Sequence, residues 1–385
     1  MPAAVISMVL PLMLLLSSCS SSGAGPITSI FSFGDSIADT GNHCYLLFKA
    51  GKRANNCFLP YGETFFRRPT GRSCDGRLII DFIAEYLGLP LLPPYFGGSP
   101  DNFHGGVNFA VGTATALHTD FLTSKLDVKI TTTNVSLGVQ LDLFKQLLPS
   151  LCGDGIQTGC RHLFSKSLFI LGEIGGNDYN LPLTDGHGFN DDIQQLVPLV
   201  VGYIGFVLRE IIELGAVNIL VPGNFPIGCL PFYLTKFRNS SSMNYDPSTG
   251  CLTRLNKLSK YHNELLQAEL SSTRQLYPDV NIIYVDYYNA VFRIYQAPEQ
   301  FGFTGETWKA CCEGEGSVQC GSPSVKPCDD SSKYVNWDGL HFTEATYGSV
   351  ARSILEEGLF MHPSFNLSSS SRIARDSGDY FPNSF

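Results

Sequence analysis

Five short, almost wholly apolar segments recur along this chain, separated by longer segments whose apolar residues repeat at helical spacing. A strand that helices cover on both faces reads as a continuous apolar run. Because parallel strands need a long crossover, usually a helix, this alternation predicts a parallel sheet. The predicted strands are Ser29–Phe33, Val107–Ala110, Leu168–Leu171, Ile219–Pro222 and Ile282–Asp286. The predicted helices are Leu78–Leu87, Val139–Leu148, Ile193–Leu214, Leu252–Tyr277 and a last one from Thr343 to about Glu357.

The chain of 385 residues shows no composition break and no internal repeat, which predicts one doubly wound α/β domain over residues 25–363. Two irregular stretches, Lys49–Arg77 and Gln296–Tyr334, are rich in Gly, Pro, Cys and polar residues. We interpret them as surface insertions that border a substrate cleft. Residues 364–385 are polar and serine-rich, which predicts a flexible tail.

The N-terminus has the pattern of a secretory signal. Val5 to Leu16 is apolar but short for a membrane span, and Ser17 to Gly25 is rich in small residues. We predict a signal peptide over residues 1–24 and a secreted chain; the alternative is a retained membrane anchor. No later segment is predicted to span a membrane. The formal charge of −9, without a basic run, argues against nucleic acid or an anionic membrane as partner.

Cysteine usage fits an oxidising compartment. Twelve cysteines are present, and Cys19 falls within the signal. Cys152/Cys160 and Cys229/Cys251 are candidate disulfides, and the remaining odd count of cysteines predicts at least one unpaired thiol. The group Cys311, Cys312, Cys320 and Cys328 lacks zinc-site spacing, so disulfides are favoured over a metal site there. Sequons at Asn134, Asn239 and Asn366 are candidate glycosylation sites.

Polar or glycine-rich residues follow four of the predicted strands. The carboxyl ends of parallel strands lie at one edge of the sheet, where open α/β sheets bind ligands. Ser36 is therefore a candidate nucleophile, although Gly-Asp-Ser is also common turn chemistry. The four segments are Gly34-Asp35-Ser36, Val111-Gly112-Thr113, Gly175-Gly176-Asn177-Asp178 and Pro222-Gly223-Asn224.

A serine nucleophile needs a base and a carboxylate that orients the base. His341 has Asp338 three residues before it, which would let the two side chains meet; alternatively, Asp338 caps the helix that follows. Asn177 either forms a turn or donates its amide to an oxyanion. His262 lies in a predicted helix and is interpreted as a solvated surface histidine.

Together these residues resemble the GDSL esterase/lipase family, the plant branch of the SGNH hydrolases. The resemblance runs from about Ile27 to Phe360. It implies a flavodoxin-like three-layer α/β/α sandwich with a mainly parallel five-stranded sheet, ester hydrolysis, and no cofactor or metal. The similar segments are Phe33–Asn42, Glu173–Tyr179, Leu220–Cys229 and Tyr334–His341.

Carried over to this chain, the resemblance makes Ser36 the nucleophile, His341 the base and Asp338 its orienter. The Ser36 N–H and the Asn177 amide would be oxyanion donors. The family usually places a further donor, a glycine, where this chain has Thr113, and the glycine stands one position earlier. Either the loop shifts so that Gly112 serves, which is our prediction, or Thr113 serves with altered geometry.

Two milder departures are Ile37 in place of leucine in the first motif and a shortened stretch, Glu313–Gly316, after Cys311-Cys312. The sequence thus predicts a secreted serine esterase or lipase that acts on a small-molecule or lipid ester. Two alternatives stay open: an acyltransferase that uses the same acyl-enzyme, and a binding protein weakened in catalysis by the change at Gly112. The natural ester and the oligomeric state are not indicated.

Overall fold

The computed structural model describes residues 26–126, 133–152, 156–184, 191–238, 244–314 and 319–367. The predicted signal peptide, Asn239 and most of the predicted tail lie outside these ranges. Strands β1 to β5 are parallel, β6 is antiparallel to β5, and the sheet order is β2-β1-β3-β4-β5-β6. The strands are β1 Ser29–Phe33, β2 Gly106–Asn108, β3 Ser167–Leu171, β4 Asn218–Pro222, β5 Asn281–Val285 and β6 Met361–His362.

The predicted mainly parallel sheet is therefore confirmed, but its count of five strands is wrong. The sixth, β6, has two residues, which is too short to show an apolar period. All five predicted helices are present, and the described residues contain further helices that were not predicted. The helices are α1 Asn42–Lys49, α2 Ile79–Tyr86, α3 Thr119–Leu126, α4 Leu137–Cys152, α5 Ile156–Ser165, α6 Gly176–Thr184, α7 Asp191–Glu213, α8 Pro231–Lys236, α9 Thr253–Leu276, α10 Tyr287–Gln296 and α11 Glu344–Leu355.

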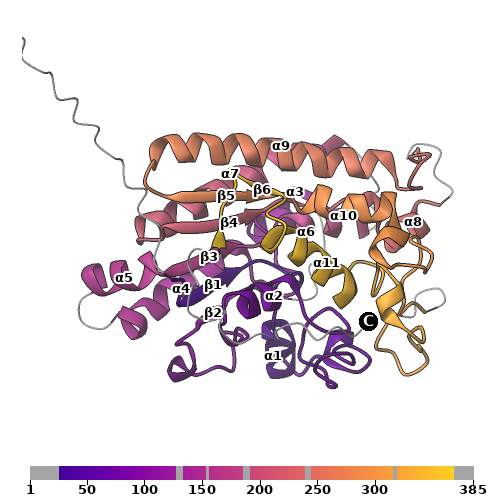
Figure 1. Cartoon of the computed structure of the whole chain (residues 1–385), viewed down its shortest axis with the longest axis horizontal. Helices are drawn as coiled ribbons and strands as arrows, with labels where there is room; N and C mark the ends of the chain where they lie inside the picture. The colour runs from indigo at the N-terminus through magenta and orange to yellow at the C-terminus, as the bar shows by residue number, and fades with distance from the viewer. Residues whose placement is uncertain are drawn as a thin grey trace, which may run out of the picture.

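Neighbouring residues of β3 mark the two faces of the sheet. Phe169 stacks on Phe31 of β1 with 5.2 Å between ring centroids, and both rings contact Phe144 of α4. Ile170 points the opposite way and lines a small apolar space with residues of α2 and α11. Helices thus cover both faces, which confirms the three-layer α/β/α sandwich. Figure 1 shows the strands across the middle of the molecule, with α9 along the top and α1 and α2 below.

One helix, α7, is long and apolar enough to cross a membrane by length and composition, which we had not predicted for any segment after the N-terminus. Within Ile193–Glu213 of α7, an 18-residue window has a mean hydropathy of 1.6, enough for a membrane span by length and composition alone. More than half of this window, 56%, is buried inside the protein, where α7 packs against α9. A buried core helix passes the same test, so the helix is weak evidence for a membrane segment.

Five disulfides cross-link the described residues: Cys44–Cys57, Cys152–Cys160, Cys229–Cys251, Cys311–Cys328 and Cys312–Cys320. Both predicted pairs and the disulfide interpretation of the last four cysteines are confirmed. Among the cysteines that the structure describes, the unpaired one is Cys74, which is buried.

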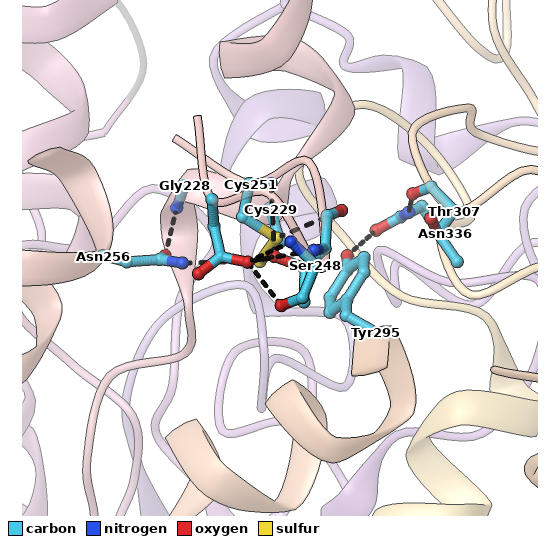
Figure 2. The surroundings of a disulfide bond; sticks show 10 residues. Gly228, Cys229, Ser248, Cys251, Asn256, Tyr295, Thr307 and Asn336 are labelled. Atoms are coloured by element: carbon cyan, nitrogen blue, oxygen red, sulfur yellow. Dashed lines mark hydrogen bonds between the residues drawn. A yellow bond between two sulfur atoms is a disulfide. The ribbon is translucent and has the colours of Figure 1, made fainter. Parts of the chain in front are cut away.

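The Cys229–Cys251 disulfide joins the segment after β4 to the start of α9. Figure 2 shows how Asn256 of α9 supports it. The Asn256 side chain accepts from the Gly228 N–H at 2.9 Å, and its amide donates to the Cys229 sulfur at 3.5 Å. The same figure shows Tyr295 of α10, whose hydroxyl donates to Asn336 at 2.7 Å. That bond anchors the segment that leads to Asp338.

The first insertion is fixed to α2 by a buried ion pair. Arg72 donates from Nε and Nη2 to the two carboxylate oxygens of Asp81, at 2.8 and 2.7 Å. Both side chains are buried. The insertion is therefore an integral part of the domain rather than a loose surface loop.

Arg72→Ala is expected to lower the free energy of unfolding by roughly 3–5 kcal/mol, because it leaves the buried Asp81 carboxylate without its partner. Denaturant titration checks this. The control is Lys145→Ala, which breaks the half-exposed pair with Glu210 and is expected to cost less than about 1 kcal/mol. Equal losses in the two variants would contradict the structural role of Arg72.

Candidate active site

Ser36 stands in the turn that follows β1, half-buried at the carboxyl edge of the sheet. The turn begins at Gly34, whose φ of 143° lies where side chains are disfavoured and where a Cβ would come 3.1 Å from the Glu173 carbonyl oxygen. Gln140 of α4 bonds both the N–H and the carbonyl of Gly34, at 2.9 and 2.8 Å. Asp35 accepts from the Ile37 N–H at 3.0 Å. These bonds fix the backbone that presents the Ser36 hydroxyl.

Ser36, His341 and Asp338 form one hydrogen-bonded chain. His341 Nε2 lies 2.8 Å from Ser36 Oγ, and Nδ1 lies 2.9 Å from each carboxylate oxygen of Asp338. Asp338 Oδ1 also accepts from the N–H groups of Leu340 and His341, both at 2.8 Å. The helix that follows is capped by Thr343, not by Asp338. The carboxylate faces the histidine, so the capping alternative is excluded.

Asp338 and His341 each favour the charged form of the other. Burial favours neutral His341, but the charge of Asp338 and its hydrogen bond outweigh burial and raise the pKa of His341 above its ordinary value. Burial raises the pKa of Asp338, but the charge of His341 and the donated hydrogen bonds outweigh this and lower it. An ionised carboxylate therefore faces a histidine that holds a proton readily, which suits a general base.

Asn177, in the first turn of α6, points its amide toward the Ser36 turn. Its Nδ2 donates to Asp35 Oδ2 at 3.1 Å and to the Ala114 carbonyl at 2.9 Å. The Asn177 amide thus ties the turn after β1 to the loop after β2. Its acceptor Asp35 is buried, which raises the pKa of Asp35 to about 6, although the Ile37 N–H and the charge of His341 lower it.

The loop after β2 differs from the prediction. The Gly112 N–H already donates to Asp39 Oδ2 at 2.7 Å, so this donor is held by a carboxylate. Thr113 has φ 68°, in the left-handed region that favours glycine. The loop therefore has not shifted to place the glycine: Thr113 adopts the conformation for which glycine is the usual residue.

Two buried carboxylates that the sequence analysis did not single out as functional hold this loop. Asp39 accepts from Gly112 at one end. Asp178 of α6 accepts from the N–H groups of Ala116 and Leu117 at the other end, at 2.8 and 3.0 Å. Burial raises the pKa of Asp178 to about 7, against the effect of these two N–H donors. The loop is anchored to the elements that carry Ser36 and Asn177.

The interpretation of His262 as a surface histidine is wrong. His262 is buried, and its Nδ1 bonds the hydroxyl of Tyr179 of α6 at 2.8 Å. Its neighbour Asn263 donates to the carbonyl of Asn224, after β4, at 3.0 Å and accepts from its N–H at 2.8 Å. Burial lowers the pKa of His262 to about 3, so this histidine is neutral. His262 and Asn263 thus connect α9 to α6 and to the segment after β4.

Two candidate glycosylation sites lie within the described residues, and both Asn134 and Asn366 are exposed. Next to the latter, Leu367 is buried against the core, so the predicted tail begins with an anchored segment. Among the described residues, no group of three or more His, Cys, Asp or Glu side chains is placed to hold a metal ion.

Comparison with known proteins decides the family. The family model of GDSL-like lipases and acylhydrolases matches residues 30–354. The chain belongs to this family. It is 50% identical over 348 residues to GDSL esterase/lipase At1g28640 of Arabidopsis thaliana, covering 89% of this chain and 88% of that protein. It is 48% identical to sinapine esterase of Brassica napus, covering 88% of each chain.

Membership of the GDSL family makes this chain a hydrolase of ester bonds. Among solved structures, an acetyl-xylooligosaccharide esterase variant from Geobacillus Stearmophilus matches at a TM-score of 0.36 and 14% identity, covering 87% of this chain and 95% of that one. At that level the match adds nothing to the assignment.

Proposed function

We propose that this GDSL enzyme is a secreted serine esterase in which Ser36 attacks the ester carbonyl, His341 is the base and Asp338 orients His341. The observation that carries the proposal is the continuous hydrogen-bonded chain from Ser36 Oγ through His341 to Asp338. Residues 305 apart in the sequence are within hydrogen-bond distance, at the sheet edge where ligands of this fold bind.

The proposed reaction has two halves. His341 Nε2 takes the Ser36 proton while Oγ bonds to the carbonyl carbon, and the carbonyl oxygen becomes an oxyanion. The oxyanion collapses, the alcohol leaves with the proton from His341, and an ester to Ser36 remains. Water then attacks this ester, again giving its proton to His341. The second oxyanion collapses, His341 gives its proton to Ser36 Oγ, and the acid leaves, which restores the Ser36 hydroxyl.

We propose that the N–H groups of Ser36 and Thr113 and the amide of Asn177 bind the oxyanion. Gly112 is replaced in this role by Thr113, since the Gly112 N–H is held by Asp39 and Thr113 has the glycine-like φ. The Asn177 amide would exchange its longer bond, 3.1 Å to Asp35, for the oxyanion. Because Thr113 retains this conformation, the argument for a catalytically weakened protein loses its support.

Gly112→Ala is expected to lower kcat about 100-fold, because the new Cβ would lie 2.9 Å from His43 Nδ1 and displace the loop. Thr113→Gly is the matched control. It retains the backbone N–H and suits φ 68°, so kcat should stay within a few-fold of wild type. Steady-state kinetics on p-nitrophenyl butyrate distinguish the two variants. A larger loss in Thr113→Gly than in Gly112→Ala would contradict this description of the loop.

The direct test of the proposed function is product analysis. Purified enzyme is incubated with p-nitrophenyl butyrate, with and without a primary alcohol as competing acceptor, and with sinapine as a second ester. Esterase activity releases the free acid even when the alcohol is present. Transfer of most acyl groups to the alcohol would favour the acyltransferase instead, and release of neither product would contradict both.

A further inference from the structure

Tyr61 belongs to the first insertion, far in the sequence from Asp338 and His341, and it reaches the hydrogen-bonded chain at Asp338. Its hydroxyl donates to Asp338 Oδ2 at 2.8 Å, across 277 positions of sequence. The Tyr61 side chain is buried. Asp338 Oδ2 therefore receives both Tyr61 and His341, while Oδ1 receives backbone N–H groups and His341.

The ring of Tyr61 is held by the second insertion. It meets Trp337 edge to face, with 5.8 Å between the ring centroids. Tyr61 and Trp337 form a small core of their own with three disulfide-bonded cysteines, separate from the main core: Cys311, Cys312 and Cys320. The Cys312 N–H also donates to the Trp337 carbonyl at 2.7 Å, one residue before Asp338. The two insertions thus meet behind the carboxylate.

We propose that Tyr61 is a positioning residue that holds the Asp338 carboxylate toward His341 and keeps it ionised, and that the disulfide-bonded insertion holds Tyr61 in place. This inference rests on the proposed function of Ser36, His341 and Asp338. The insertions then serve the active site directly, rather than only bordering a cleft.

The chemistry of a buried phenol supports this role. Burial, and then the neighbouring charge of Asp338, raise the pKa of Tyr61 well above its ordinary value, so the hydroxyl stays protonated and can only donate to the carboxylate. A donor on Oδ2 favours the charged carboxylate and shares its negative charge. Without that donor, Asp338 attracts a proton more strongly and also favours protonated His341. Both effects leave less of the active form at low pH.

Tyr61→Phe tests the proposal because it removes the hydroxyl and keeps the ring on Trp337. We expect kcat on p-nitrophenyl butyrate to fall about 10-fold with little change in KM, as for a lost hydrogen bond to a charged group. The acid limb of the profile of kcat/KM against pH should move up by about half a unit to one unit. The control is Tyr277→Phe, which removes a hydroxyl that donates to Glu213 at the surface. Its kinetics should match wild type.

A second arm strengthens the donor instead of removing it. Difluorotyrosine in place of Tyr61 is nearly the same size and a stronger acid, so the acid limb should move to lower pH. An unchanged pH profile in both Tyr61 variants, or a fall in kcat without a shift, would overturn the proposal and leave Tyr61 as a packing residue only. Failure of the proposed function looks different: Ser36→Ala would then keep the wild-type rate, whatever Tyr61 does.

Discussion

Ser36→Ala should abolish ester hydrolysis, with kcat lower by roughly 10⁴- to 10⁶-fold and KM little changed, because the alanine variant has no nucleophile. The substitution removes one hydroxyl from a half-buried turn, so the fold should be retained. Hydrolysis of p-nitrophenyl butyrate, with circular dichroism to verify folding, measures the effect. The residual rate would come from the oxyanion donors and substrate binding.

Ser99→Ala is the matched control, because Ser99 is an exposed serine that makes no side-chain cap to the turn it precedes. Its rate should equal that of wild type. A folded Ser36→Ala protein that keeps more than about a hundredth of the wild-type kcat would contradict the nucleophile assignment, since losses in such variants are far larger.

Asp338→Asn is expected to lower kcat by about 10³- to 10⁴-fold, since the amide cannot stabilise the imidazolium that forms on His341. It should also move the pH profile. In wild type, activity requires neutral His341, whose pKa Asp338 raises above the ordinary 6.5 in spite of burial. Activity should thus rise with pH through a midpoint above 6.5. In the variant only the charge of Asp35 still opposes burial, so the midpoint should fall below that of wild type.

Kinetics from pH 5 to 9 measure both effects, with Asp101→Asn, at an exposed position, as the control that should change neither. An acid limb that stays in place or moves to higher pH in Asp338→Asn would contradict the electrostatic pairing of Asp338 with His341.

Strongly patterned parts of this chain could be predicted from sequence alone. The first strand was predicted with its observed bounds, because its residues are buried on both faces and so are almost all apolar. The spacing of Asp338 and His341 was equally informative, because residues three apart can meet in a short turn. In contrast, β6 pairs over two residues at the sheet edge, and no local pattern marks so short a strand.

The error at His262 came from its polar neighbours in α9. Leu255, Leu258, Leu266 and Leu270 repeat at helical spacing, and His262 lies on the same buried face. That spacing was sufficient to predict burial of His262. Its bond to Tyr179 depends on where α6 lies, which the sequence of α9 does not contain.

The contact of Tyr61 with Asp338 and the conformation of the Gly112–Thr113 loop could not be predicted from the sequence. Contact between Tyr61 and Asp338 depends on how two insertions fold together around Trp337, and neither insertion has a periodic pattern. The choice between Gly112 and Thr113 depends on one backbone angle and on a bond to Asp39. The Tyr61 contact and the choice between Gly112 and Thr113 both depend on tertiary structure.

The most direct test of the central claim is covalent labelling of the folded enzyme by a fluorophosphonate, which reacts with activated serine hydroxyls. Peptide mapping by mass spectrometry then locates the label. We predict a single labelled residue, Ser36, with labelling that is lost in Ser36→Ala and slowed as His341 becomes protonated at low pH. An enzyme that hydrolyses esters but carries the label on another residue, or none on Ser36, would contradict the claim.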